Sequence, residues 1–181
     1  MQPDCVYNIE TESGKFMAGV GNTIIANSPR RGINFVTRKI TRETAKIITG
    51  EVDKIHLGNL DAKRDWGFSG EYVQAMWKIL QQEKADDFVI ATGKTHSCRD
   101  WLSKCEKIFG MQDDRCITIL DNLKRPNEVN VLIGDASKAH QILKWKADCD
   151  FDTLAFKMCQ YDLHNFSPDP SIRRHTDEFL F

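Results

Sequence analysis

The chain has 181 residues, of which 41% are hydrophobic and 28% charged, enough apolar material for the core of one domain and too much for wholesale disorder. Lysine and arginine number 25 against 26 aspartates and glutamates, and this net charge of −1 excludes a globally basic nucleic-acid binder. The apolar runs fall well short of the roughly 20 residues of a membrane helix, and the polar start lacks the order of a signal peptide. We therefore expect a soluble, cytoplasmic protein that binds neither nucleic acid nor membrane.

The first 23 residues show no clear hydrophobic period, and we expect them to be an irregular segment. After the turn-like sequence Ser28–Gly32, a helical pattern starts at Asn34 and stops at Gly50. Its predicted apolar face holds Phe35, Ile40, Ala45, Ile47 and Ile48. A short strand is predicted over Ile55–Gly58.

Ser69 is the expected cap of a second helix that runs through Gln82. Its apolar residues recur at helical spacing and include Tyr72, Val73, Met76, Trp77, Ile79 and Leu80. The apolar run Phe88–Ala91 predicts a buried strand of a parallel sheet. Ser97 is then expected to cap a third helix that ends at Gly110.

The last third of the chain continues this alternation. Strands are predicted over Cys116–Leu120 and Val129–Ile133, a short helix over Ser137–Leu143, and a final helix from Asp150 to about Phe166. Strands that alternate with helices indicate the α/β class. We expect an unmatched segment at 1–23, an α/β region at 24–166 and a loose tail at 167–181.

The six cysteines are widely spaced, and no two form a Cys-x-x-Cys pair, so neither a metal site nor a redox motif is expected. Cys98 and Cys105 lie seven residues apart on one face of the third predicted helix. We interpret them as small buried hydrophobic residues. The stretch Gly19–Ile24 superficially matches a dinucleotide-binding loop, but Ile24 replaces the third glycine, and the preceding residues form a poor buried strand.

Three clusters carry charge suited to an anionic ligand. The segment Ser28–Lys46 holds six basic residues and one acid, although spacing alone favours a solvated helix face that includes Arg38 and Arg42. The second cluster, Leu57–Gly67, joins a strand to a helix, where ligands often bind. The third, Lys124–Val129, places an arginine and a glutamate three residues apart. Each of these two loops alone is also compatible with a surface ion pair.

Together and in this order, the clusters resemble one family. The sequences Ser28-Pro29-Arg30-Arg31-Gly32, Asn34–Ile40 and Leu57–Gly67 are similar to those of GDP-mannose 4,6-dehydratases, of the extended short-chain dehydrogenase/reductase group. The similarity continues almost colinearly to Leu163. It covers only the C-terminal portion of such enzymes, which implies a substrate-binding part that lacks most of the Rossmann sheet.

The resemblance implies a set of substrate-binding residues. Lys39 and Arg64 would face the nucleotide and pyrophosphate of GDP-mannose, Arg125 and Glu128 the diphosphate and ribose, and Asn59 would order its loop or touch the nucleotide, with Val36 as an apolar wall beside the base. Arg31 matches a cofactor-side arginine. Where the family has Asn-His-Glu before the Ser-Pro-Arg-Arg sequence, this chain has Ile25-Ala26-Asn27, so two further family contacts are lost.

The family reaction oxidises the sugar at C4 with NADP, eliminates water across C5 and C6 and returns the hydride to C6, giving GDP-4-keto-6-deoxymannose in the GDP-fucose pathway. The 181 residues contain no Tyr-x-x-x-Lys pair, so we assign no catalytic residue and expect neither NADP binding nor activity from this chain alone. Expected partners are a GDP-sugar and either further copies of the chain or a complete subunit. The alternatives are a non-catalytic GDP-sugar-binding or regulatory partner of such a subunit, and a non-functional remnant.

Overall fold

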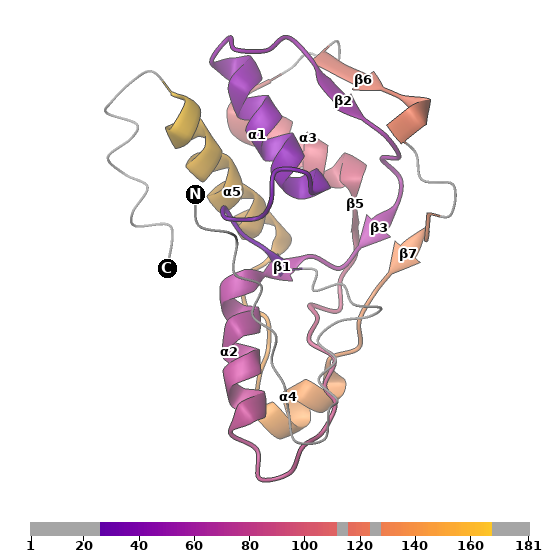
Figure 1. Cartoon of the computed structure of the whole chain (residues 1–181), viewed down its shortest axis with the longest axis vertical. Helices are drawn as coiled ribbons and strands as arrows, with labels where there is room; N and C mark the ends of the chain where they lie inside the picture. Colours follow the sequence, from indigo (N-terminus) through magenta and orange to yellow (C-terminus); the bar gives the residue numbers. More distant parts are fainter. Residues whose placement is uncertain (1–25, 112–115, 124–127, 168–181) are drawn as a thin grey trace.

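The computed structural model describes residues 26–111, 116–123 and 128–167. Figure 1 shows two groups of helices, with α1, α3 and α5 at one end of the molecule and α2 and α4 at the other. The α-helices are α1 (Val36–Ile48), α2 (Ser69–Leu80), α3 (Cys98–Phe109), α4 (Ser137–Leu143) and α5 (Phe151–Phe166). The strands are β1 (Ala26–Asn27), β2 (Ile55–Leu57), β3 (Lys63–Arg64), β4 (Gly67–Phe68), β5 (His96–Ser97), β6 (Ile117–Ile119) and β7 (Val131–Leu132), and a 3-10 turn spans Asp121–Leu123.

The strands form three small sheets among the described residues. β1 pairs with β4 and β2 with β6, both in parallel. The third sheet has the order β5-β3-β7, in which β3 is antiparallel to β5 and parallel to β7. The α/β class is therefore confirmed, with only a small amount of sheet.

The larger core lies between α1, α3 and α5 and contains Ile40, Trp101, Leu154 and Met158, all fully buried. Trp66 extends this core toward β4 and packs edge-on against Trp101. Helix α3 begins as predicted, because the Ser97 hydroxyl accepts a bond from the Asp100 N–H and the Asp100 carboxylate accepts one from the Ser97 N–H. Gly110 ends the helix in the left-handed conformation.

The smaller core lies between α2 and α4 and is built on Tyr72, Ala75, Phe88, Leu143 and Trp145. It is tied to α2 by the Trp145 indole, which donates to the Glu71 carbonyl at 2.9 Å. Lys144, with φ of 50°, ends α4 and turns the chain so that Trp145 reaches this core. No helix in the described part of the chain is both long and apolar enough to cross a membrane.

Several local predictions are wrong. Phe88–Ala91 belongs to none of the three sheets, and Val89 within it is 42% exposed. Phe68 rather than Ser69 caps α2, without a side-chain hydrogen bond. On α2 the predicted core residues Val73, Trp77 and Leu80 are 61%, 63% and 55% exposed.

The first helix is also shorter than predicted and starts at Val36. Phe35 and Ile48, at its two ends, are exposed, whereas Ile40 and Ala45 are fully buried. The helical period therefore predicts the buried face correctly in the middle of α1, but it predicts burial too far toward both ends of the helix. The segments 1–23 and 168–181 lie outside the described residues.

Candidate functional site

Arg64 and Glu128 meet where the chain approaches β7, next to the central strand β3 of the β5-β3-β7 sheet. The guanidinium of Arg64, on β3, forms an ion pair with the Glu128 carboxylate and donates to the Val129 and Lys63 carbonyls at 2.7 Å each. Both side chains are more than four-fifths buried. Two residues that are 64 positions apart in sequence, and that were assigned to one ligand, are thus brought into contact.

These partners leave the Arg64 guanidinium with further donors. Arginine carries five N–H groups, and the described partners of Arg64 are two carbonyls and one carboxylate. A guanidinium that is held on one side in this way is preorganised to bind an anion on its other side. The arrangement also has a purely structural use, because it ties the approach to β7 onto β3.

Lys39 and Val36 lie on the first turns of α1. The Lys39 ammonium donates to the His56 carbonyl on β2 at 2.5 Å, and Val36 is partly buried against the larger core. α1 thus lies against the strand that leads into the loop of Asn59. In that loop the Asn59 side-chain oxygen accepts the Asp61 N–H at 2.9 Å, which is a loop-ordering contact. Arg125 lies outside the described residues.

The neighbouring basic residue Arg38 behaves differently from the prediction of a solvated face. It is 8% exposed, and its guanidinium lies 2.7 Å from the Asp162 carboxylate on α5. Arg42, one turn later, contacts the adjacent Glu43 at 3.2 Å. The basic residues of α1 therefore do not form a single open patch.

The residues that the structure describes do not by themselves fit an NADP site. Arg31, the one residue carried over to the cofactor side, is half-buried with its guanidinium stacked 4.2 Å over the Phe35 ring, and burial lowers its pKa from the usual value. Helix α1 starts after Phe35 without a side-chain cap, and the turn that precedes it contains a single glycine, Gly32. The Gly19–Ile24 stretch is outside the described residues.

Asp65, next to Arg64, is buried and connects several segments of the chain. Its carboxylate accepts from the Thr92 N–H at 3.0 Å, the Thr92 hydroxyl at 2.5 Å and the Gly93 N–H at 2.9 Å. A longer contact of 3.4 Å reaches the Gly134 N–H. Asp65 thereby joins the end of β3 to two other segments of the chain.

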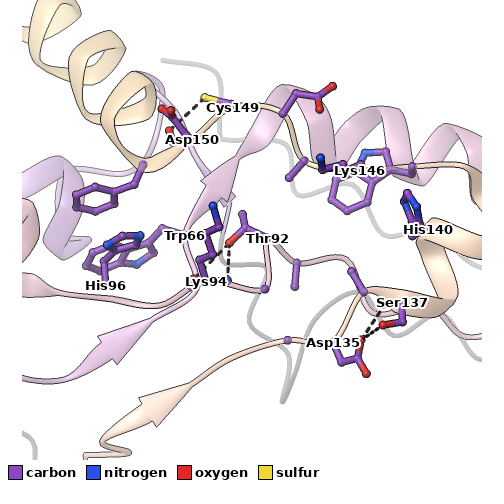
Figure 2. Close-up of a pocket in the computed structure, with 18 of the residues that line it drawn as sticks. Trp66, Thr92, Lys94, His96, Asp135, Ser137, His140, Lys146, Cys149 and Asp150 are labelled. Carbon is purple, nitrogen blue, oxygen red and sulfur yellow. Dashed lines mark hydrogen bonds between the residues drawn. The ribbon is translucent and has the colours of Figure 1, made fainter.

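A cavity of about 970 Å³ opens beyond these segments, between α4, the start of α5 and the loop that follows Ala91. Figure 2 shows His96 and Trp66 on one side, His140 and Lys146 on the other, and Asp135 and Asp150 on its rim. His96 stacks on Phe151 at 3.8 Å between ring centroids, and burial lowers its pKa. None of the described residues assigned to the substrate lines this cavity.

The charges around the cavity do not select one ligand. Asp135 and Asp150 accept hydrogen bonds from Ser137 and Thr153, which lower their pKa values, so both stay ionised opposite Lys94 and Lys146. No group of His, Cys, Asp and Glu that could hold a metal ion occurs among the described residues. The cysteine prediction is confirmed for Cys98 and Cys105, which are buried and free.

The family model for GDP-mannose 4,6 dehydratase matches residues 2–158, and so also includes most of the segment 1–23. The chain is 45% identical over 169 residues to GDP-mannose 4,6 dehydratase of Cricetulus griseus, covering 83% of this chain and 45% of that protein. It is 48% identical over 144 residues to GDP-mannose 4,6 dehydratase 2 of Arabidopsis thaliana, covering 78% of this chain and 39% of that protein. The chain thus spans less than half the length of these relatives.

Solved structures give the same fold. RMD from Pseudomonas aeruginosa complexed with NADPH matches 76% of this chain and 46% of that chain, with a TM-score of 0.68 and 16% identity. The dTDP-glucose 4,6-dehydratase from Bacillus anthracis in complex with NAD covers 81% of this chain and 45% of that chain, with a TM-score of 0.67 and 12% identity. The small sheets and the helices around them are therefore part of a short-chain dehydrogenase/reductase fold, and the sequence matches show that the chain belongs to the GDP-mannose 4,6 dehydratase family.

Proposed function

We propose that this chain is the GDP-sugar-holding part of a GDP-mannose 4,6-dehydratase and is inactive alone. The observation that supports the proposal most directly is the ion pair of Arg64 and Glu128, which lies between β3 and the segment before β7. The family model that matches this chain is that of GDP-mannose 4,6 dehydratase. A guanidinium there suits a pyrophosphate, and a carboxylate suits the ribose hydroxyls. Lys39, Val36, Asn59 and Arg125 complete the proposed site.

The part of these residues in the reaction is to bind and orient the nucleotide. Lys39 and Arg64 would balance the phosphate charge, while Glu128 would hold the Arg64 fork and accept from a sugar hydroxyl. NADP, where it is bound, supplies hydride removal and return. Since the described residues do not fit that cofactor, and the sequence holds no Tyr-x-x-x-Lys pair, we propose that its site and the proton-transferring groups come from residues outside these 181, in the same cytoplasmic assembly.

A second candidate function is binding without catalysis. The chain would hold a GDP-sugar, or pair with a complete subunit and regulate it. The exposed stripe of Val73, Trp77 and Leu80 on α2 favours this candidate, because it offers a surface for another polypeptide. A remnant without ligand function is the outcome in which neither binding nor pairing is found.

Calorimetric titration of the purified chain tests the proposal. We expect binding of GDP-mannose and of GDP, much weaker binding of UDP-glucose, and no binding of NADPH. Conversion of GDP-mannose to the 4-keto-6-deoxy product by the chain alone would contradict its inactivity. Absence of GDP-mannose binding at millimolar concentration would overturn the proposed site.

A further inference from the structure

Asp162 on α5 is fully buried and holds α1 by two contacts. One carboxylate oxygen lies 2.7 Å from the Arg38 guanidinium, and the other accepts from the Thr41 hydroxyl at 2.7 Å. The Arg38 guanidinium also lies 5.1 Å from the centre of the Tyr161 ring. Figure 1 shows α5 alongside α1. A buried aspartate that binds residues on successive turns of a neighbouring helix fixes both the rotation of that helix about its axis and its position along that axis.

The rotation of α1 matters because its sides carry different groups. Arg38 faces α5, while the adjacent Lys39 reaches β2 and donates to the His56 carbonyl. Residues one apart on a helix differ by about 100° in direction, so any rotation that moves Arg38 moves Lys39 and Val36 with it. The first turn has other anchors, with the Thr37 hydroxyl donating to the Asn27 side chain and the Trp101 indole donating to the Thr37 carbonyl.

We infer that Asp162 is a positioning residue for nucleotide binding, acting through Arg38 and Thr41 on Lys39 and Val36 of α1. This inference rests on the proposed function and deepens it. Asp162 is remote in sequence from every residue assigned to the ligand. Its carboxylate is the negatively charged group among the contacts that hold the first turns of α1. Apolar packing of Ile40 alone would hold α1 against the core but would resist rotation less, since dispersion contacts have little directional preference.

The test compares Asp162→Asn with a matched control, Leu143→Ala, which perturbs the smaller core at α4. Arg38→Met and Arg38→Lys form a second pair, because the lysine keeps a charge for Asp162. Affinity for GDP-mannose is measured by calorimetry well below each melting temperature. The indole N–H resonance of Trp101, which lies against the first turn of α1, gives a readout that needs no ligand.

We expect Asp162→Asn and Arg38→Met to bind GDP-mannose about tenfold more weakly or worse, and Arg38→Lys to retain part of the affinity. The Trp101 resonance should move in Asp162→Asn and stay in place in Leu143→Ala. Unchanged affinity in both Asp162→Asn and Arg38→Met would overturn the inference even if their melting temperatures fall. If wild type binds no GDP-mannose, the proposed function fails, and an unmoved Trp101 resonance in Asp162→Asn would then overturn the positioning role as well.

Discussion

Arg64 illustrates how one side chain can serve both a fold and a ligand. Its guanidinium joins β3 to the approach of β7 through Glu128 and the Val129 carbonyl, and it has further N–H groups for a phosphate. We expect Arg64→Ala to weaken GDP-mannose binding by about 1.5–3 kcal/mol, the range for a hydrogen bond to a charged group. Arg64→Lys should restore only part of this, because an ammonium cannot form the same fork.

Lys63→Ala is the control for that experiment, since Lys63 is exposed and is not assigned to the ligand. Calorimetry gives the affinities, and thermal unfolding gives the stabilities. If Arg64 only ties the loop down, Arg64→Ala will lower the melting temperature and leave the affinity, measured well below that temperature, unchanged. Higher salt should weaken wild-type binding more than binding by Arg64→Ala.

Asp162 makes a prediction about pH. Its pKa is 3.8 in an unfolded chain, and burial raises it to about 6 in the folded protein, against the opposing effects of Arg38 and Thr41. The folded state therefore binds this proton more tightly, and the contribution to stability is complete below about pH 3.8 and lost as pH rises through about 6. Asp162→Asn should match wild type near pH 4 and exceed its unfolding free energy by up to ~3 kcal/mol at neutral pH.

Urea unfolding of both proteins across this pH range measures the difference, in which carboxylates such as Asp100 and Asp150 cancel. A variant that is less stable than wild type at neutral pH would contradict the prediction. A gain in stability together with a loss in GDP-mannose affinity would show that the charge at position 162 serves positioning at the expense of stability.

At the scale of elements, the sequence predicts well where a local rule decides. The capping box of Ser97 and Asp100 and the left-handed Gly110 set the ends of α3, and both follow from residue type and spacing. The apolar run of Phe88–Ala91 predicts a strand wrongly, because strand pairing depends on a neighbour, and among the described residues none pairs with it. On α2 the helix itself is predicted correctly, yet half of the apolar residues that were expected in the core are exposed.

The junction of β4 and α2 depends on Gly67. A Cβ atom at this position would lie 2.5 Å from Cε1 and Oη of Tyr72, whose ring is buried in the smaller core. Since the ring cannot move without disturbing that core, we expect Gly67→Ala to lower the unfolding free energy by about 1–3 kcal/mol. Gly32→Ala is the control, because its Cβ would meet only the exposed Phe35 ring, at 3.3 Å. Equal stability of the two variants in urea unfolding would contradict this account.

At the scale of the whole molecule, the residue types of the candidate site could be predicted, but their mutual arrangement could not. The pairing of Arg64 with Glu128 joins β3 to the segment before β7, with the whole of α2 and α3 between them in the chain, and no local pattern encodes that contact. The partners of Asp65 could not be predicted for the same reason, since Thr92 and Gly134 are distant from it in sequence. The family resemblance gave the candidate residues. The structure shows which of the described candidates lie close together.

The apolar surface of α2 leads to a prediction about assembly. Val73, Trp77 and Leu80 follow the spacing of one helix face, and each is more than half exposed. The segment Phe88–Ala91, which follows α2 in the chain, belongs to none of the sheets. An exposed apolar stripe of this kind favours contact with another polypeptide, because the side chains leave water there.

We therefore expect the purified chain to associate, with an apparent mass that rises with concentration in sedimentation velocity. Trp77→Lys should weaken this association about tenfold or more, since burial of a large aromatic side chain contributes about 1.5–3 kcal/mol. Ile48→Lys is the control, because Ile48 is also exposed but lies at the end of α1, on the other helix group. A strictly monomeric wild type with a sharp two-state thermal transition would contradict the prediction. Equal weakening by both substitutions would show that the chain associates through general hydrophobicity and not through α2.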